Sequence, residues 1–289
     1  MPRVVCAGHL NWDITLRVDA LPDPDAEVRV NERRAGGGGS AANVAKGLAD
    51  LDVDATLLGC VGDDEEGRTA REELSDAGVD VGPVLTSSEQ PTTTKYLAVD
   101  PSGEVMVLGC PGANEGFAAE DLPAATLAAA DHLHLTSQRP ETAARLAERA
   151  RDRGVPVSFD PGRRLGDRGY GPVLTSVEYL FLNDREAALA LDAFDLGGQT
   201  LVLKHGPEGA EIRDGAERTA HPGYPIDAVD TTGAGDAFAA GFIAARVDGA
   251  DDRRALAVAN ACGALAANAP GARTSLSWDD VEAFIGRDG

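Results

Sequence analysis

Near the carboxyl end of the chain, residues 230–236 read Asp-Thr-Thr-Gly-Ala-Gly-Asp, between a strand-like stretch and an apolar run. That run, residues 237–246, is rich in alanine and predicts a buried helix that begins just after the second glycine. A helix start leaves backbone amides free for an anion, and glycines let the chain approach it closely. A carboxylate beside a phosphate repels it, so Asp236 is better explained as a base that takes a proton from an attacking hydroxyl. The segment therefore predicts phosphoryl transfer, with an anion hole made by the amides of Gly233, Ala234 and Gly235.

The same segment also has a purely structural explanation. A helix cap followed by glycine for packing fits these residues equally well when they are considered alone. The segment is not a Walker loop, because no Lys followed by Ser or Thr comes after its last glycine. The rest of the chain has to decide between the two explanations.

Four further segments occur in order along the chain: GGSAANVA at 38–45, GCVGDD at 59–64 with Gly67, NDRE at 183–186 and KHGPEG at 204–209. Together with residues 230–236, they resemble the signatures of the PfkB (ribokinase-like) carbohydrate kinases, and the matches run from about residue 4 to about residue 285. The resemblance implies a doubly wound, mostly parallel α/β sheet with helices on both faces and a small β-sheet lid. It also implies an ATP-dependent kinase that uses Mg²⁺.

Two positions depart from the family pattern. Asp52 stands where the loop after the first helix usually has glycine, which we attribute to the acidity of the surface. Gly162 replaces the asparagine of an Asp-Pro-Asn-x-Arg stretch, so a substrate contact through that asparagine is not available here.

On the nucleotide side, the resemblance implies that Asn183 and Glu186 hold Mg²⁺ through water. Their three-residue spacing fits a helix cap and its capping-box partner just as well. Asp230 and Thr232 resemble the K⁺ loop of some family members, but the sequence does not show whether a K⁺ site forms. The resemblance also implies nucleotide contacts from Lys204, Gly206, Gly209 and Asn260. Without a nucleotide, the two glycines would simply be turn residues and Asn260 a surface residue of its helix.

On the acceptor side, the resemblance implies sugar contacts from polar groups after the first strand and at the start of the first long helix. Turn-forming side chains and a salt-bridging arginine explain the same positions without a ligand. The residues are Asn11, Asp13, Gly38, Gly39, Asn43 and Arg164.

The sequence leaves several acceptors open. A small sugar or sugar derivative, as in ribokinase, fructokinase or 2-keto-3-deoxygluconate kinase, would use polar contacts. A nucleoside would need an apolar slot, for which Trp12, Tyr96 and Phe117 are candidates. A sugar phosphate such as ribose 1-phosphate would favour the pair Arg163 and Arg164. A non-catalytic sugar-binding regulator is disfavoured by the retained base, and a dinucleotide oxidoreductase by the absence of Gly-x-Gly-x-x-Gly after the first strand.

The elements that must position these residues alternate between strands and helices. Apolar runs predict the strands of a mostly parallel sheet at 4–8, 55–60, 132–135, 155–159, 179–182 and 200–203. Alternating runs without crossover helices predict a separate small sheet, at 13–18, 27–34, 92–99 and 104–108. We therefore expect one kinase domain over residues 1–289, with lid segments at about 13–34 and 92–110. The family resemblance implies that this small sheet acts as a lid over the sugar, and whether it also forms a homodimer surface stays open.

Composition narrows the possible partners. The formal charge of −22, from 48 acidic and 26 basic residues, disfavours nucleic acid and anionic membranes as partners. Acidic side chains spread along the chain, with only three lysines, favour the salt-rich cytoplasm of a halophilic organism. Four widely spaced cysteines give no zinc motif, and neither an export signal nor a membrane span is indicated. We therefore expect a cytoplasmic protein.

Overall fold

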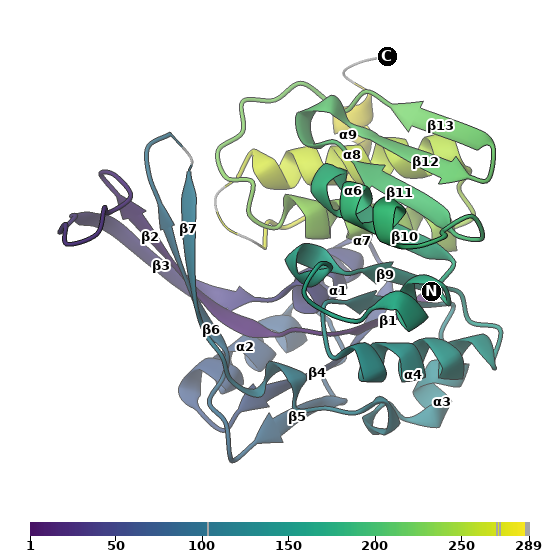
Figure 1. The fold of residues 1–289 in the computed structure, drawn as a ribbon, viewed down its shortest axis with the longest axis horizontal. Coiled ribbons are helices and arrows are strands. Elements are labelled where there is room, and N and C mark those ends of the chain that lie inside the picture. The colour runs from purple at the N-terminus through teal and green to yellow at the C-terminus, as the bar shows by residue number, and fades with distance from the viewer. Residues whose placement is uncertain (103, 270, 272, 287–289) are drawn as a thin grey trace.

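A computed structural model describes residues 1–102, 104–269, 271 and 273–286 (Figure 1). Its large sheet has nine strands in the order β13-β12-β11-β10-β9-β8-β1-β4-β5. The pairs from β5 to β11 are parallel, and β12 and β13 are added antiparallel at one edge. In chain order the strands are β1 (Arg3–Ala7), β4 (Asp54–Gly62), β5 (Val84–Ser87), β8 (His132–Thr136), β9 (Val157–Asp160), β10 (Tyr179–Asn183), β11 (Thr200–Lys204), β12 (Ala210–Asp214) and β13 (Glu217–His221).

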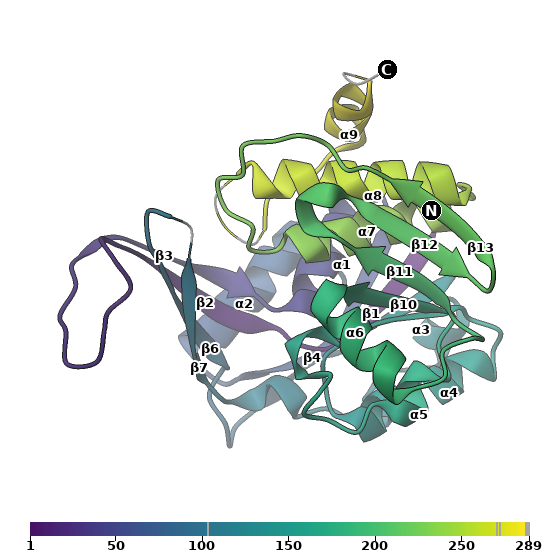
Figure 2. The ribbon, with the colours of Figure 1, turned by 45° about the horizontal axis from the view of Figure 1, so that its top comes forward.

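Helices cover both faces of this sheet, as the alternating pattern predicts (Figure 2). One hydrophobic core lies under α1 (Ser40–Asp50), α2 (Glu65–Asp76), α7 (Ala234–Val247), α8 (Asp252–Ala267) and α9 (Trp278–Ile285). A second core, on the other face, is closed by α3 (Ala124–Ala128), α4 (Pro140–Arg151), α5 (Gly171–Leu174) and α6 (Asp184–Ala193). The doubly wound, mostly parallel fold class is confirmed.

The sequence did not predict the edge hairpin of β12 and β13. These strands carry charged residues along one exposed face, so their apolar pattern is weak. The structure also changes the interpretation of Asp52, whose φ of 57° lies in the left-handed region. The family's usual glycine suits this position because glycine adopts that conformation without strain. Surface acidity alone therefore does not explain why this position is special.

A second sheet of four strands, in the order β3-β2-β6-β7, projects from the main body (Figure 1). The strand β2 begins four residues after β1 ends, so the projecting sheet is rooted at the carboxyl edge of the main sheet. All four strands were predicted, although the second starts and ends later than expected because it continues through three glycines. The strands are β2 (Asn11–Val18), β3 (Val30–Gly38), β6 (Thr94–Val99) and β7 (Val105–Cys110).

The turn between β6 and β7 was predicted at residues 100–103. Asp100 accepts hydrogen bonds at Oδ1 from the amides of Ser102, at 2.8 Å, and Glu104, at 3.0 Å. The fourth position of the predicted turn, Gly103, lies outside the described residues.

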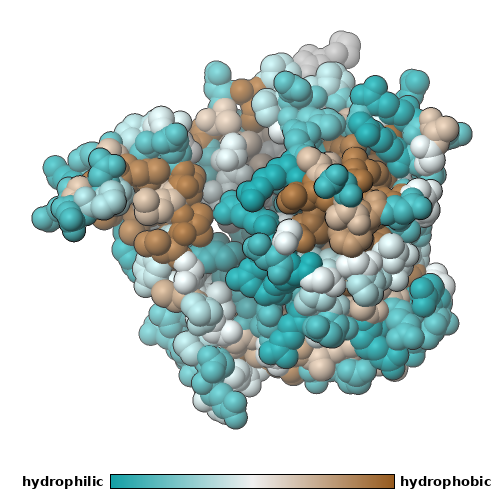
Figure 3. All heavy atoms as spheres, viewed as in Figure 1, coloured by the Kyte–Doolittle hydropathy of each residue, from teal (hydrophilic) through white to brown (hydrophobic). Residues whose placement is uncertain are grey.

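The small sheet exposes apolar side chains along its projecting strands. Figure 3 shows this apolar surface over the projecting strands. Its exposed members are Val105, Val107 and Leu108 on β7, with Val30 on β3 and Tyr96 on β6.

Candidate active site

The carboxyl ends of three neighbouring strands deliver polar side chains to one place. Asp160 ends β9, Asn183 ends β10 and Lys204 ends β11. The amino end of α7 reaches the same place, since an added Cβ on Gly235 would lie 3.8 Å from Lys204 Nζ. Parallel sheets of this kind bind ligands outside the carboxyl ends of their strands.

The helix α7 starts at Ala234, two residues before the start that the sequence predicted. Gly233 is its N-cap, with φ of 78°, a conformation that glycine adopts without strain. This left-handed residue turns the chain into the helix, so Gly235 lies inside the first turn and Asp236 is the third helical residue. The amides of Gly233 and Gly235 and the Asp236 carboxylate therefore share one helix start, while the amide of Ala234 donates to the carbonyl of Thr231 at 3.2 Å.

Asp236 has the properties of a proton acceptor. Its Oδ2 accepts a hydrogen bond from Asn43 Nδ2 at 2.8 Å. Burial raises the pKa of Asp236 from 3.8 to about 6, and the neighbouring charge of Asp160 adds to this, against the opposing effects of Asn43 and Lys204. A carboxyl with a pKa near neutrality is ionised at pH 7 yet still basic enough to take a proton.

Lys204 stands beneath this helix start in a buried ion pair. Its Nζ lies 2.6 Å from Asp160 Oδ2, and both side chains are 16% exposed. Burial opposes the charged form of Lys204, but Asp160, together with Glu186 and Asp236, raises its pKa above the usual value. The ammonium thus remains charged beside the amides of α7, where an anion would be attracted. The sequence did not assign a role to Asp160.

Arg273 extends the network from Asn43 to the root of the small sheet. Its Nε donates to Asn43 Oδ1 at 3.0 Å, and its Nη2 donates to the carbonyl of Gly38 at 3.1 Å. Its Nη1 lies 3.2 Å from Glu73 Oε2. Burial lowers the pKa of Arg273 to about 10. No motif in the sequence pointed to this residue.

Two of the predicted acceptor-side glycines are required by close packing. A Cβ on Gly38 would lie 2.0 Å from Asp13 Oδ2. A Cβ on Gly39, whose φ is 97°, would lie 2.4 Å from the carbonyl of His9. These glycines bring the first turn of α1 against Asp13, so the predicted residues Asp13, Gly38, Gly39 and Asn43 do come together.

Several buried polar atoms at this place have no partner among the described residues. They include Asn11 Nδ2 and Asp13 Oδ1. Asn114, from the short 3-10 turn at Ala113–Glu115, donates to Asn11 Oδ1 and leaves its own Oδ1 without a partner. Buried polar atoms are rarely left unpaired, so these donors and acceptors indicate a hydroxyl-bearing ligand. The sequence did not single out Asn114.

On the nucleotide side, Asn183 and Glu186 form the capping box that the sequence offered as an alternative. Asn183 Oδ1 accepts from the amide of Glu186 at 2.9 Å, and Glu186 Oε2 accepts from the amide of Asn183 at 3.0 Å. Glu186 is nonetheless 5% exposed, and burial together with the charge of Asp160 raises its pKa. A cation beside Glu186 would offset both the cost of burying its charge and the repulsion by Asp160. The capping box therefore does not exclude Glu186 as a residue that helps to hold a metal ion.

Other predicted nucleotide residues lie apart from the charged cluster or are engaged locally. Gly206, with φ of 58°, is exposed in the turn after β11. Gly209 packs against His221 and Gly223, where a Cβ would clash. Asn260 is buried, which excludes the surface explanation, and it donates to the carbonyl of Leu256 at 2.8 Å.

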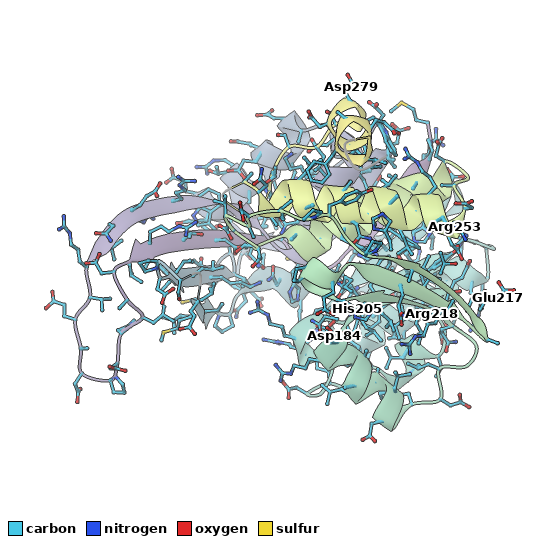
Figure 4. All side chains as sticks on the ribbon, turned by 90° about the horizontal axis from the view of Figure 1, so that it is seen from above. Asp184, His205, Glu217, Arg218, Arg253 and Asp279 are labelled. Atoms are coloured by element: carbon cyan, nitrogen blue, oxygen red, sulfur yellow. The ribbon has the colours of Figure 1, made fainter. Side chains whose placement is uncertain are left out.

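The opening of α6 and the turn after β11 lie beside each other. Figure 4 shows Asp184 and His205 pointing toward one another, and Asp184 Oδ1 lies 2.6 Å from His205 Nδ1. This contact ties the residue after Asn183 to the residue after Lys204. The two segments that the sequence assigned to the nucleotide are therefore neighbours.

Arg164 is exposed, and its side chain has no hydrogen bond or ion pair among the described residues, although its carbonyl accepts from the amide of Asp167 at 3.0 Å. It follows Gly162, whose φ is 62°, in a 3-10 turn after β9. A left-handed φ suits glycine and is also tolerated by asparagine, which accounts for the departure from the family stretch at this position.

A pocket of about 210 Å³ opens between the small sheet, α2 and the segments before α7 and after α8. Asp230 lines it, with Oδ1 accepting from the amide of Thr232 at 3.0 Å and Oδ2 from that of Gly271 at 3.1 Å. Arg17 Nη2 lies 3.7 Å from Asp230 Oδ2. Protein groups thus surround the carboxylate at which the sequence suggested K⁺.

Proteins with similar sequences or folds are small-molecule kinases. An ATP-dependent ribose-1-phosphate kinase from Halopiger xanaduensis is 53% identical, over 99% of this chain and 98% of its own length. The solved nucleoside kinase from Methanocaldococcus jannaschii superposes with a TM-score of 0.87 at 25% identity, covering 99% of both chains. The solved ribokinase from Thermotoga maritima gives 0.87 at 26% identity, again over 99% of both.

The fold and the site together define an ATP-dependent kinase that phosphorylates an alcohol group of a small sugar or sugar derivative. Residues 1–279 match the model of the pfkB family of carbohydrate kinases. The chain belongs to this family, which confirms the resemblance in the sequence. None of the helices within the described ranges is both long and apolar enough to cross a membrane.

Proposed function

We propose that this enzyme transfers the γ-phosphoryl group of ATP to the hydroxymethyl oxygen of ribose 1-phosphate. The observation that carries the chemistry is the placement of the Asp236 carboxyl, whose pKa burial raises, at the start of α7 beside Asn43, Lys204 and the amides of Gly233 and Gly235. The choice among sugar, nucleoside and sugar phosphate is supported by the 53% identity to a ribose-1-phosphate kinase over nearly the whole chain.

In this mechanism, Asp236 accepts the proton of the acceptor hydroxyl while the oxygen of that hydroxyl forms a bond to the γ-phosphorus of ATP. The bond from that phosphorus to the bridging oxygen breaks, and its electron pair leaves with ADP. The amides of Gly233, Ala234 and Gly235 stabilise the charge on the phosphoryl oxygens. Lys204 adds positive potential beside the start of α7. Asn43 orients the Asp236 carboxylate through its hydrogen bond.

Mg²⁺ would be held near Glu186 and Asn183, where a cation relieves the raised pKa of Glu186. When bound, it neutralises charge on the ATP phosphates. Among the described residues, no three acidic, histidine or cysteine side chains gather closely enough to form a metal cage, which fits an ion held through water and phosphate. For K⁺, Asp230 and Thr232 stay a prediction, because the Asp230 carboxylate already faces two amides and Arg17.

We further propose that the chain acts as one kinase domain whose small sheet, residues 13–34 and 92–110, closes over the acceptor. The exposed apolar side chains of β7 support the same sheet as a homodimer surface. The charge of −22 and the halophilic relative support function in a salt-rich cytoplasm, so assays belong at molar KCl.

The substrate assignment is tested by an acceptor screen. With saturating ATP and Mg²⁺, we expect kcat/KM for ribose 1-phosphate to exceed that for ribose, fructose, 2-keto-3-deoxygluconate and adenosine by about 100-fold or more, the effect of about 3 kcal/mol of extra recognition. Coupled detection of ADP gives the rates, and phosphorus NMR gives the product. A higher kcat/KM for any unphosphorylated acceptor would exclude the assignment, while turnover of none would contradict the kinase mechanism itself.

The proton acceptor also sets the pH dependence. We expect kcat/KM to fall about tenfold per pH unit below about pH 6, because Asp236 must be ionised and its pKa is about 6. ATP titrates in a similar range, so the control is Asp160→Asn. Removing the Asp160 charge lowers the pKa of Asp236 and should move the acid limb to lower pH, whereas a limb due to ATP would not move.

A further inference from the structure

Cationic side chains lie beside the acceptor residue Asp13 and its neighbour His9. Lys95 on β6 is paired in register with Asp13 on β2, so the two side chains leave the small sheet on the same face. The charge of Lys95 acts on both Asp13 and His9. Arg168, from the segment before α5, also acts on His9. Lys95 and Arg168 therefore approach the loop after β1 from the small sheet and from the main body.

Arg168 is firmly held in this group. Its Nη1 lies 2.7 Å from Glu115 Oε1 and donates to the carbonyl of Gln138 at 2.8 Å. Arg139 Nε lies 4.0 Å from Glu115 Oε2. Hydrogen bonds from His9 and Arg168 lower the pKa of Glu115 to about 2, so this carboxylate stays ionised. The Glu115 carboxylate thus faces the guanidinium groups of Arg139 and Arg168, and Lys95 adds a third positive charge nearby.

Lys95 differs from the other two lysines of the chain. Lys46 lies 2.6 Å from Asp50, and Lys204 lies 2.6 Å from Asp160. Within the part of the chain that the structure describes, Lys95 has no carboxylate within 4.0 Å, although the chain has 48 acidic and 26 basic residues. Asp13 is the nearby counter-charge, but a partly buried ammonium with no carboxylate in direct contact is still costly unless a ligand supplies one.

The loop after β1 also contains a buried hydrogen-bond donor that is incompletely satisfied. Asn11 is 0% exposed, and its Nδ2 makes no hydrogen bond of normal geometry among the described residues, although an interaction with Asn11 lowers the pKa of Asp13. Exchanging the amide orientations of Asn11 and Asn114 would still leave one donor and one acceptor unpaired, because the pair shares a single hydrogen bond. A ligand with anionic oxygens would satisfy both this donor and Lys95.

The pocket near Asp230 is a weaker candidate for the same anion. Its three arginines each have a carboxylate partner within 4.0 Å: Arg17 with Asp230, Arg34 with Glu32, and Arg273 with Glu73. An anion there would have to displace an ion pair at every arginine, whereas beside the loop after β1 Arg168 is paired with Glu115 but Lys95 has no ion pair within the described part of the chain. Around His9 and Asp13, by contrast, the cations Lys95, Arg139 and Arg168 outnumber the carboxylates Asp13 and Glu115 by one.

We propose that Lys95, Asn11 and Arg168 form the subsite for the phosphate already present on the acceptor. This inference rests on the proposed function and names the residues that select a phosphorylated sugar. Asp13 and Asn43 then hold the sugar between two phosphate positions, with Asp236 at the reacting end and Lys95 at the other. Lys95 is a specificity residue that touches the substrate and takes no part in proton transfer.

The test compares Lys95→Met and Lys95→Arg with the parent enzyme, using Lys46→Met as the matched control. For Lys95→Met, we expect the KM for ribose 1-phosphate to rise about 10- to 100-fold, the effect of one lost charge-assisted hydrogen bond, with kcat within about threefold. Kinetics with ribose should stay within about threefold. Lys95→Arg should recover most of the loss, and Lys46→Met should match the parent.

A second measurement does not depend on turnover. Inorganic phosphate should compete with ribose 1-phosphate in the parent enzyme, and its inhibition constant should rise about tenfold or more in Lys95→Met. An unchanged KM and an unchanged inhibition constant would overturn the subsite. Equal losses with ribose and ribose 1-phosphate would also overturn it, because they indicate a general structural role. If the parent enzyme does not use ribose 1-phosphate but uses another acceptor, the proposed function fails instead, and the two failures are distinguishable.

Discussion

Replacing Asp236 by asparagine is expected to lower kcat about 10³-fold, while the dissociation constant of ATP stays within about threefold of the parent value. Asparagine keeps the size of the side chain and its contact with Asn43 but cannot accept a proton. The rate is measured by ADP release with saturating acceptor, and nucleotide binding by calorimetry. Parental turnover by the variant would remove Asp236 from the role of base.

The same variant gives a control for folding. The pKa of Asp236 rises from 3.8 to about 6 in the folded state, so the stability that this group contributes is complete below about pH 3.8 and is lost as the pH rises through 6. Asparagine does not ionise. Asp236→Asn should therefore be more stable than the parent by roughly 2 kcal/mol at pH 8, after a discount for partial exposure, and nearly equal at pH 4. Urea unfolding at both pH values measures this, and a variant less stable at both would mean that its inactivity reflects misfolding.

Replacing Lys204 by methionine is expected to lower kcat about 100-fold and to destabilise the fold by about 3 kcal/mol. The methionine fills similar space, but the transferring phosphoryl group loses a positive charge beside the start of α7. Asp160 then lies buried without its partner, next to Glu186 and Asp236. Steady-state kinetics and urea unfolding measure the two losses.

A double variant separates these two effects. Adding Asp160→Asn to Lys204→Met removes the unpaired buried charge, so stability should recover by about 2 kcal/mol while kcat stays low. Recovery of both together would mean that Lys204 serves only to neutralise Asp160. The existing ion pair would then be structural, and the amides of α7 would act without it.

The arrangement of the main sheet was predictable because its strands are short, apolar and separated by amphipathic helices. Runs such as residues 132–135 and 179–182 are buried on both sides, and such strands are easily recognised. The hairpin of β12 and β13 was missed because one face is solvated and charged. The extension of β3 through three glycines was missed because glycine normally indicates a loop, whereas here Gly38 is needed to admit Asp13.

The candidate site was predictable where a local pattern reflects a local structure. The start of α7, the capping pair Asn183 and Glu186, and the glycines before α1 each depend on neighbours in the sequence. Asp160, Arg273 and Asn114 could not be assigned in this way, because their partners are distant along the chain. Arg273, for example, bonds to Asn43, 230 residues earlier, and only the folded chain makes that contact.

The strand β2 carries Asp13 at its base, and the same strand continues outward as part of the projecting sheet. Any movement of that sheet must therefore shift the Asp13 carboxylate, which we propose contacts the sugar. We expect the catalytic residues to be incompletely arranged when no acceptor is bound. Water would then be a poor substitute for the acceptor alcohol, and ATP hydrolysis would be slow. A protein built in this way would conserve cellular ATP when its carbohydrate is scarce.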